Sequence, residues 1–220
     1  MFYVIAHRPI LLMFSLVALG LLAGVVVHRR SGNRWGYAII IPAFVLAMVN
    51  IFTGQWLNAA FLNAAGVHGT AVIIDSRRTD SMLNNQYIWD YDVVLRTADG
   101  KDVTTGFSSM SATIWPIRNA ILVPPQGETF VAKYIPGFER NIVIMSDESG
   151  YGKRRLIAEA QAPVERARRI LEASPANPDF LTGYRQVLRD FIDTYSEAAN
   201  PDLIARYEQD LRDLDTLPGQ

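Results

Sequence analysis

PILLMFSLVALGLLAGVVV, residues 9 to 27, is a run without a charged side chain, and HRRSGNRW, residues 28 to 35, follows it directly. At about 1.5 Å of rise per residue, such a run matches the hydrocarbon core of a bilayer. A second uncharged run extends from Gly36 to Leu62. The sequence therefore predicts a transmembrane helical hairpin in residues 1–65, with spans of about 9–27 and 36–57.

A cleaved signal peptide is the alternative interpretation of the first run, because Arg8 could form its charged region and ALGLLAG supplies small residues. The arginines directly after the run, and the second apolar run beyond them, favour the hairpin. Gly20 and Gly24 have the small-xxx-small spacing that lets two helix backbones approach closely. We expect the two spans to pack on each other there.

The orientation of the hairpin follows from its arginines. Arg29, Arg30 and Arg34 lie in the short loop, whereas Arg8 flanks the other side, and no lysine or arginine follows the second span until Arg77. Short loops rich in lysine and arginine stay in the cytoplasm. The sequence predicts a two-span protein of the bacterial inner membrane, with its C-terminal region in the periplasm or outside.

Composition excludes several classes of function. The 220 residues carry a net charge of -1, so no global basic field indicates a nucleic-acid partner. Cysteine is absent, which removes disulfides, thiolate catalysis and cysteine metal sites. The histidines His7, His28 and His68 are isolated and have no metal-ligand spacing. We expect no metal, no cofactor and no small-molecule substrate.

Alternating apolar residues after Gly66 predict strands over residues 66–147. GTAVIIDSRRT is one strand, and QYIWDYDVVLRTADGKDVTTGF is a hairpin that turns at Asp99-Gly100. GETFVAKYIP and RNIVIMS supply two more, and the segment 108–125 fits a loop with a helical turn. One face of the hairpin's first arm is expected in the core: Tyr87, Trp89, Tyr91, Val93 and Leu95. The prediction is a small antiparallel β sheet or partly open barrel.

The segments VHGTAVIIDSRRT, YDVVLRTADGK and GETFVAKYIPGFERNIVIM resemble an uncharacterised bacterial membrane-protein family. That family has an N-terminal transmembrane pair, a glycine-threonine opening and a closing Tyr-x-Pro strand. The chain departs from the pattern at QGETF, where a glycine-aspartate pair is common, and at ERNIV, where a second proline is common. The resemblance implies a fold and a membrane setting, and it implies no catalytic residues.

Residues 148–220 contain a duplicated segment. NPDFLTGYRQVLRDF begins at Asn177 and NPDLIARYEQDLRDL begins at Asn200. Asparagine caps free amides at a helix start, proline fits the first turn, and aspartate suits the positive end of the dipole. Both copies are therefore predicted to be helices, and Pro163 is predicted to open a third, in an amphipathic helical bundle. The tripeptide KRR at 153–155 is expected in the linker before it.

No nucleophile elbow, phosphate loop or histidine-carboxylate pattern is present in the sequence. We therefore expect a non-enzymatic membrane-anchored α+β protein that presents its β domain and helical tail to a protein partner. Two alternatives stay open, an immunity protein against a periplasm-delivered toxin and an accessory subunit of a membrane channel or enzyme assembly. The apolar stripe of the first repeat copy offers the candidate partner-binding residues Tyr184, Phe191 and Tyr195.

Overall fold

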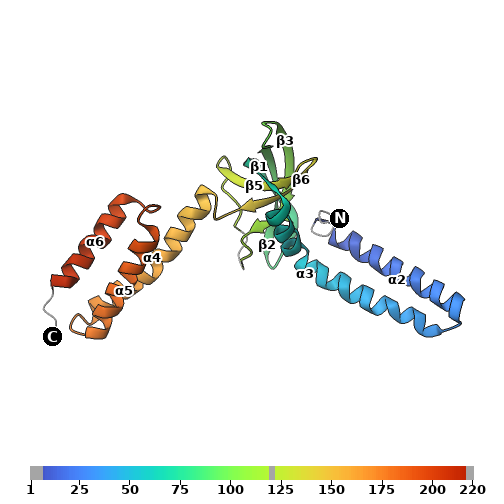
Figure 1. The fold of residues 1–220 in the computed structure, drawn as a ribbon, viewed down its shortest axis with the longest axis horizontal. Helices are drawn as coiled ribbons and strands as arrows, with labels where there is room; N and C mark the ends of the chain where they lie inside the picture. Colours follow the sequence, from blue (N-terminus) through green and yellow to red (C-terminus); the bar gives the residue numbers. More distant parts are fainter. Residues whose placement is uncertain (1–6, 119–121, 217–220) are drawn as a thin grey trace. The chain divides into compact units, whose positions relative to one another are not determined.

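The computed structural model describes residues 7–118 and 122–216. Contacts divide the chain into two compact units, Met1–Ser149 and Gly150–Gln220. The first unit contains two apolar helices and a sheet, and the second contains three helices (Figure 1). The apolar hairpin and the β domain, which the sequence analysis separated at residue 65, therefore belong to one compact unit.

The apolar hairpin consists of α2 (Pro9–Ser31), the short 3-10 helix η1 (Arg34–Ile39) and α3 (Ile40–Ala65). A proline opens α2, and Gly32 ends it with a left-handed φ of 67°. A Cβ at Gly20 would lie 3.1 Å from the Cβ of Ala43, and one at Gly24 would lie 3.0 Å from the ring of Tyr37. The predicted close packing of the spans through these glycines is confirmed.

The six strands are β1 (Val67–Leu83), β2 (Gln86–Arg96), β3 (Asp102–Ser108), β4 (Ile114–Trp115), β5 (Thr129–Ile135) and β6 (Phe138–Met145). They form one sheet in the order β3-β2-β1-β5-β6-β4. The hydroxyl of Thr105 on β3 donates to the backbone oxygen of Arg140 on β6 at 3.1 Å, so the curved sheet brings these two strands together. The arrangement is a partly open five-stranded barrel with β4 added beside β6.

Strand β4 corrects two expectations. Residues 108–125 were predicted to be a loop with a helical turn, but Ile114 and Trp115 form a strand, and the described part of the segment contains no helix. This strand runs parallel to β6, so the sheet is mixed rather than purely antiparallel. A two-residue strand is too short to produce a periodic pattern in the sequence.

The interior of the barrel is filled by alternate side chains from four strands. β1 contributes Ala71 and Ile73, and the other strands contribute Val93, Leu95, Phe130, Ala132, Tyr134, Ile142 and Ile144, all of them buried. Burial of one face of each strand is the usual source of the period-two pattern. The hairpin predicted at Asp99-Gly100 is confirmed, with Gly100 at a φ of 83°.

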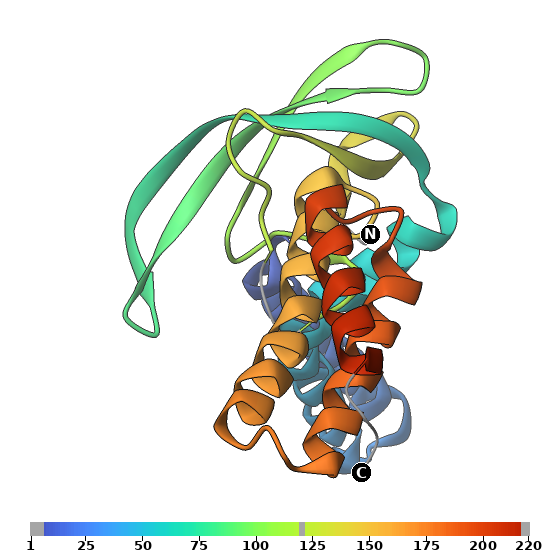
Figure 2. The same ribbon diagram turned by 90° about the vertical axis from the view of Figure 1, so that its left-hand side faces the viewer.

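The arm formed by β1 and β2 is longer than the sequence predicted, and it projects beyond the rest of the sheet (Figure 2). β1 continues to Leu83 and turns through Asn84 and Asn85, whose φ angles of 51° and 62° are typical of a two-residue hairpin turn. Two side chains expected in the core, Tyr87 and Trp89, are consequently 42% and 39% exposed. They lie on the same face of β2 as the buried Val93 and Leu95, as predicted, but beyond the end of the barrel.

The last turns of α3 pack against the outer face of the sheet. Ala59 and Leu62 are fully buried against Val143 and Met145 of β6, in a cluster that includes Trp115 at its margin. The first half of the same helix has the opposite environment, because Ile41 is 67% exposed. α3 is therefore one continuous helix whose first half is apolar and exposed and whose last turns pack on the sheet.

The second unit contains α4 (Gly150–Ala173), α5 (Pro178–Tyr195) and α6 (Pro201–Thr216). The side chain of Asn177 accepts a hydrogen bond from the backbone N–H of Asp179 at 2.9 Å, and that of Asn200 accepts one from Asp202 at 2.8 Å. The predicted caps of both repeat copies are confirmed. Their tyrosines, Tyr184 and Tyr207, are both buried in the core of the unit.

The expected start of the first helix at Pro163 is wrong. α4 begins thirteen residues earlier, at Gly150, and continues through the proline. A proline inside a helix costs one backbone hydrogen bond, and the packing of Val164 and its neighbours on α5 offsets that cost. The basic residues 153–155 consequently lie in the first turns of α4 rather than in a linker.

Candidate functional site

The most extensive exposed feature of the first unit is the apolar surface of its helical hairpin. Only 11% of each candidate span is buried, and both α2 and the η1–α3 segment are long and apolar enough to cross a membrane. The large side chains left open include Phe14, Leu19, Leu22, Ile41 and Leu46. A core helix of a soluble protein would bury most of such a surface, so the exposure of this one is compatible with a membrane span.

The candidate topology-determining arginines lie together at the far end of this hairpin. Arg29 and Arg30 occupy the last turn of α2, and Arg34 opens η1, all three of them exposed. Cations at a helix C-terminus also interact favourably with the helix dipole. The two arginines on α2 therefore have a local structural role in addition to the one that the sequence predicts.

Where α3 meets the sheet, two buried amide side chains bond to each other. Asn58 donates to the Oδ1 of Asn141 at 3.0 Å and accepts from the Nδ2 of Asn141 at 2.9 Å. Asn58 also donates to the hydroxyl of Thr113 at 3.2 Å. Asn58 and Asn141 are 0% and 2% exposed, so neither amide has water as an alternative partner. This pair fixes α3 on β6 at one register.

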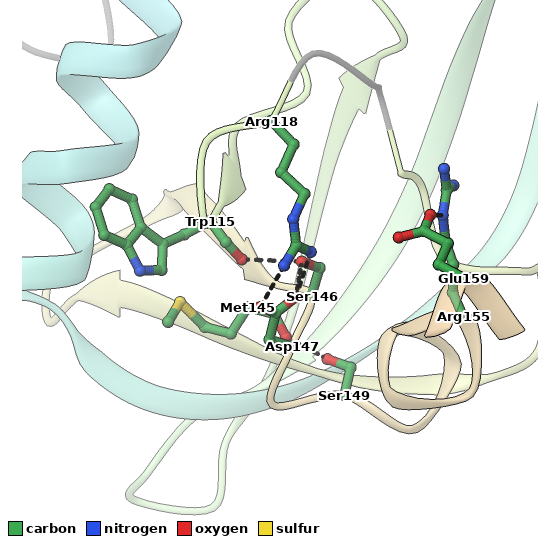
Figure 3. Close-up of polar contacts among 8 residues, drawn as sticks. All are labelled: Trp115, Arg118, Met145, Ser146, Asp147, Ser149, Arg155 and Glu159. Atoms are coloured by element: carbon green, nitrogen blue, oxygen red, sulfur yellow. Dashed lines mark hydrogen bonds and ion pairs between the residues drawn. The ribbon is translucent and has the colours of Figure 1, made fainter. Parts of the chain in front are cut away.

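A second polar cluster ties the segment after β4 to the end of β6 (Figure 3). Arg118 bonds Asp147 through both guanidinium nitrogens, at 2.6 and 2.8 Å, and the hydroxyl of Ser146 donates to the backbone oxygen of Trp115 at 3.1 Å. Two parallel bonds to one carboxylate fix its orientation. This cluster holds Trp115 where its ring packs beside α3.

The candidate partner-binding residues lie in two different environments within the helical unit. Tyr184 is 4% exposed, and its hydroxyl donates to Asp210 at 2.8 Å. Burial, and the contact with this carboxylate, raise the pKa of Tyr184 above its ordinary value. Tyr184 therefore contributes mainly to the core of the unit.

Phe191 and Tyr195 line a groove of about 310 Å³ between α4 and α5. Phe191 packs at its floor and is 3% exposed, whereas Tyr195 is half-buried. Pro163 of α4 and Val187 of α5 also line the groove, as does Thr194, which is exposed. This groove is the surface at which the partner-binding prediction can be tested.

The polar side chains of the β domain are also possible ligands or catalytic groups. The described residues contain no group of three or more histidine, cysteine or acidic side chains arranged to hold a metal. Ser108 and Ser111 bond to each other within a turn of the backbone. Asp92 pairs with Arg77 at 3.0 Å on the charged face of the β1–β2 arm.

Comparison with protein-family models, with curated proteins and with solved structures gives no match to this chain. The resemblance to the bacterial membrane-protein family therefore stays a prediction.

Proposed function

We propose that this chain is a non-enzymatic membrane-anchored protein that presents a β domain and a helical unit to a protein partner on the non-cytoplasmic side. The observation that carries the proposal is the division of α3. Its first half leaves large apolar side chains exposed, and its last turns are buried in the β domain. Because α3 is one continuous helix, its membrane-spanning half would be joined directly to the half that packs on the β domain.

The position of the arginines supports the proposed orientation. Arg29, Arg30 and Arg34 lie at the end of the hairpin that is remote from the sheet, because α3 enters the β domain at its other end. Their retention in the cytoplasm would place the bacterial inner membrane across α2 and α3, with the rest of the chain in the periplasm or outside.

A topology reporter tests this arrangement. A reporter fused after Gln220 that is active only outside the cytoplasm is expected to be active. Replacing Arg29, Arg30 and Arg34 together with asparagine should reduce that activity, because the charge bias is removed. The matched control replaces two arginines of α4, Arg154 and Arg155, and should leave the activity unchanged. A wild-type fusion that is inactive although the chain is membrane-bound would refute the orientation.

The partner requires a separate experiment. Full-length tagged protein in a mild detergent is expected to retain a specific protein, and Thr194→Arg is expected to reduce that retention because it places a charged side chain at the rim of the groove. Thr182→Arg, an equally exposed change elsewhere on α5, is the matched control. Equal retention by both variants would exclude the groove, and no specific retention by the wild type would contradict the proposed function.

A further inference from the structure

We propose that the projecting β1–β2 arm lies on the lipid headgroup region of the same membrane that α2 and α3 cross, with its aromatic face inserted at the interface. This inference rests on the proposed membrane anchor.

The level at which the apolar span ends can be located from the packing of the two helices. Gly20 and Ala43 lie side by side, at 3.1 Å from a Cβ built on the glycine. The two helices are antiparallel, so we count twelve residues outward from this contact along each of them. The count reaches Arg8, the residue before α2, and Gln55 on α3. Arg8 is the charged residue that precedes the apolar run, so Gln55 lies near the boundary of the span. Trp56, which follows, is 53% exposed, as is common for tryptophan at a membrane interface.

The base of the arm lies at this same level. The amide of Gln55 donates a hydrogen bond to the backbone oxygen of Met110, just beyond β3. The preceding residue, Ser109, donates its backbone N–H to the oxygen of Trp89 at 2.7 Å, and its hydroxyl accepts from the N–H of Trp89 at 3.2 Å. A chain of direct contacts therefore connects the end of the span to Trp89 on the arm.

The arm has one aromatic face and one charged face. Strand pairing places Arg78 opposite Trp89 and Met82 opposite Tyr87, so these side chains share the face that continues the barrel interior. The guanidinium of Arg78 lies 4.2 Å from the centre of the Tyr87 ring. Met82, Tyr87 and Trp89 are 52%, 42% and 39% exposed, so a large part of this face is accessible in the first unit.

The opposite face carries the charges. In the strand register Asp75 lies opposite Asp92, and Arg77 lies opposite Asp90. The arm is mainly aromatic on one side, where the guanidinium of Arg78 is stacked on Tyr87, and charged on the other. Such an element is suited to lie in the plane of a membrane interface. The acidic side chains lie on the face away from the lipid, and the aromatic side chains supply the insertion, so neutral lipid is sufficient for the interaction.

The test uses the full chain in vesicles of neutral phosphatidylcholine. Because the protein has no cysteine, an environment-sensitive fluorophore can be attached to Met82→Cys, with Asp90→Cys as the matched control on the charged face. We expect quenching by a water-soluble quencher to be several-fold weaker at position 82 than at position 90, and lipid-attached quenchers to show the reverse. Adding anionic phosphatidylglycerol should change neither result.

Two further variants keep the outcomes distinct. A label at Leu19→Cys, on the exposed face of α2, reports the membrane anchor itself. If the label at position 19 lies in lipid but the labels at positions 82 and 90 are quenched equally from water, the arm proposal is wrong and the membrane anchor stands. If the label at position 19 is itself exposed to water, the membrane anchor is refuted. Shielding at position 82 in native membranes but not in pure lipid vesicles would assign the face to a protein and would also overturn the lipid proposal. Trp89→Ala in the Met82→Cys chain should restore aqueous quenching at position 82.

Discussion

The buried amide pair at the junction of α3 and β6 tests how the apolar hairpin is attached to the β domain. Replacing Asn58 with leucine keeps a side chain of similar size but removes the partner of Asn141. Both polar atoms of the Asn141 amide then lose the bonds that they make to Asn58, at 2.9 and 3.0 Å, in a site that is 2% exposed. Each buried polar atom left without a partner costs about 1–3 kcal/mol, so we expect a loss of roughly 2–6 kcal/mol for the two atoms.

The double replacement Asn58→Leu with Asn141→Leu separates the hydrogen bonds from the packing. With both amides gone, no buried polar atom of the pair is left unsatisfied, and such paired apolar replacements can be nearly neutral. Thr113 loses one bond from Asn58 in both the single and the double variant. We therefore expect the double variant to be more stable than either single variant.

Equilibrium unfolding in urea, with the full chain in a mild detergent and tryptophan fluorescence as the signal, measures these differences through the midpoint of the transition. Trp115 packs in the same cluster as the end of α3 and reports on this junction. Two results would refute the reasoning. One is an unchanged midpoint for Asn58→Leu, and the other is a double variant whose loss equals the sum of the two single losses, because the pair would then have no coupling energy.

Three further predictions concern the helical unit and the domain boundary. Asn177→Ala and Asn200→Ala should each lower the free energy of unfolding by about 1 kcal/mol. Replacement of either asparagine by aspartate should be nearly neutral, because aspartate also caps a helix. Equal losses for alanine and aspartate would contradict the capping role. Since the pKa of Tyr184 is raised by folding, the stability that it contributes is fully present below its ordinary pKa of 10.0 and is lost as the pH rises above that value. Tyr184→Phe, which removes the bond to Asp210, should flatten this alkaline loss in urea titrations, and an unchanged slope would exclude the linkage. The fragment 66–220 should bind a hydrophobic dye more strongly than a fragment that retains the last turns of α3, because Val143 would be uncovered; equal dye binding would indicate that the β domain does not need the helix.

Interactions between residues close in the sequence were sufficient to predict several elements. The caps at Asn177 and Asn200 act within two residues of themselves, so sequence alone located both helix starts. The turn at Gly100 was predictable for the same reason, because its positive φ favours glycine. The close approach at Gly20 and Gly24 joins two helices and was predicted from the spacing of the small residues along one of them. The turn at Asn84-Asn85 had a weaker signal, since asparagine favours a positive φ but is common in loops of every kind.

The sequence by itself determined the apolar hairpin, the alternation of the strands and the paired helix starts, because each depends on residues that are close along the chain. Only the tertiary structure placed Asn58 against Asn141, extended α4 through Pro163 and left Tyr87 and Trp89 outside the barrel. Asn58 and Asn141 are 83 residues apart in the sequence, α4 packs on a separate helix, and the exposure of Tyr87 and Trp89 depends on where the neighbouring strands end. Periodicity assigns a side chain to a face of its strand or helix, whereas the packing of other elements determines whether that face is covered.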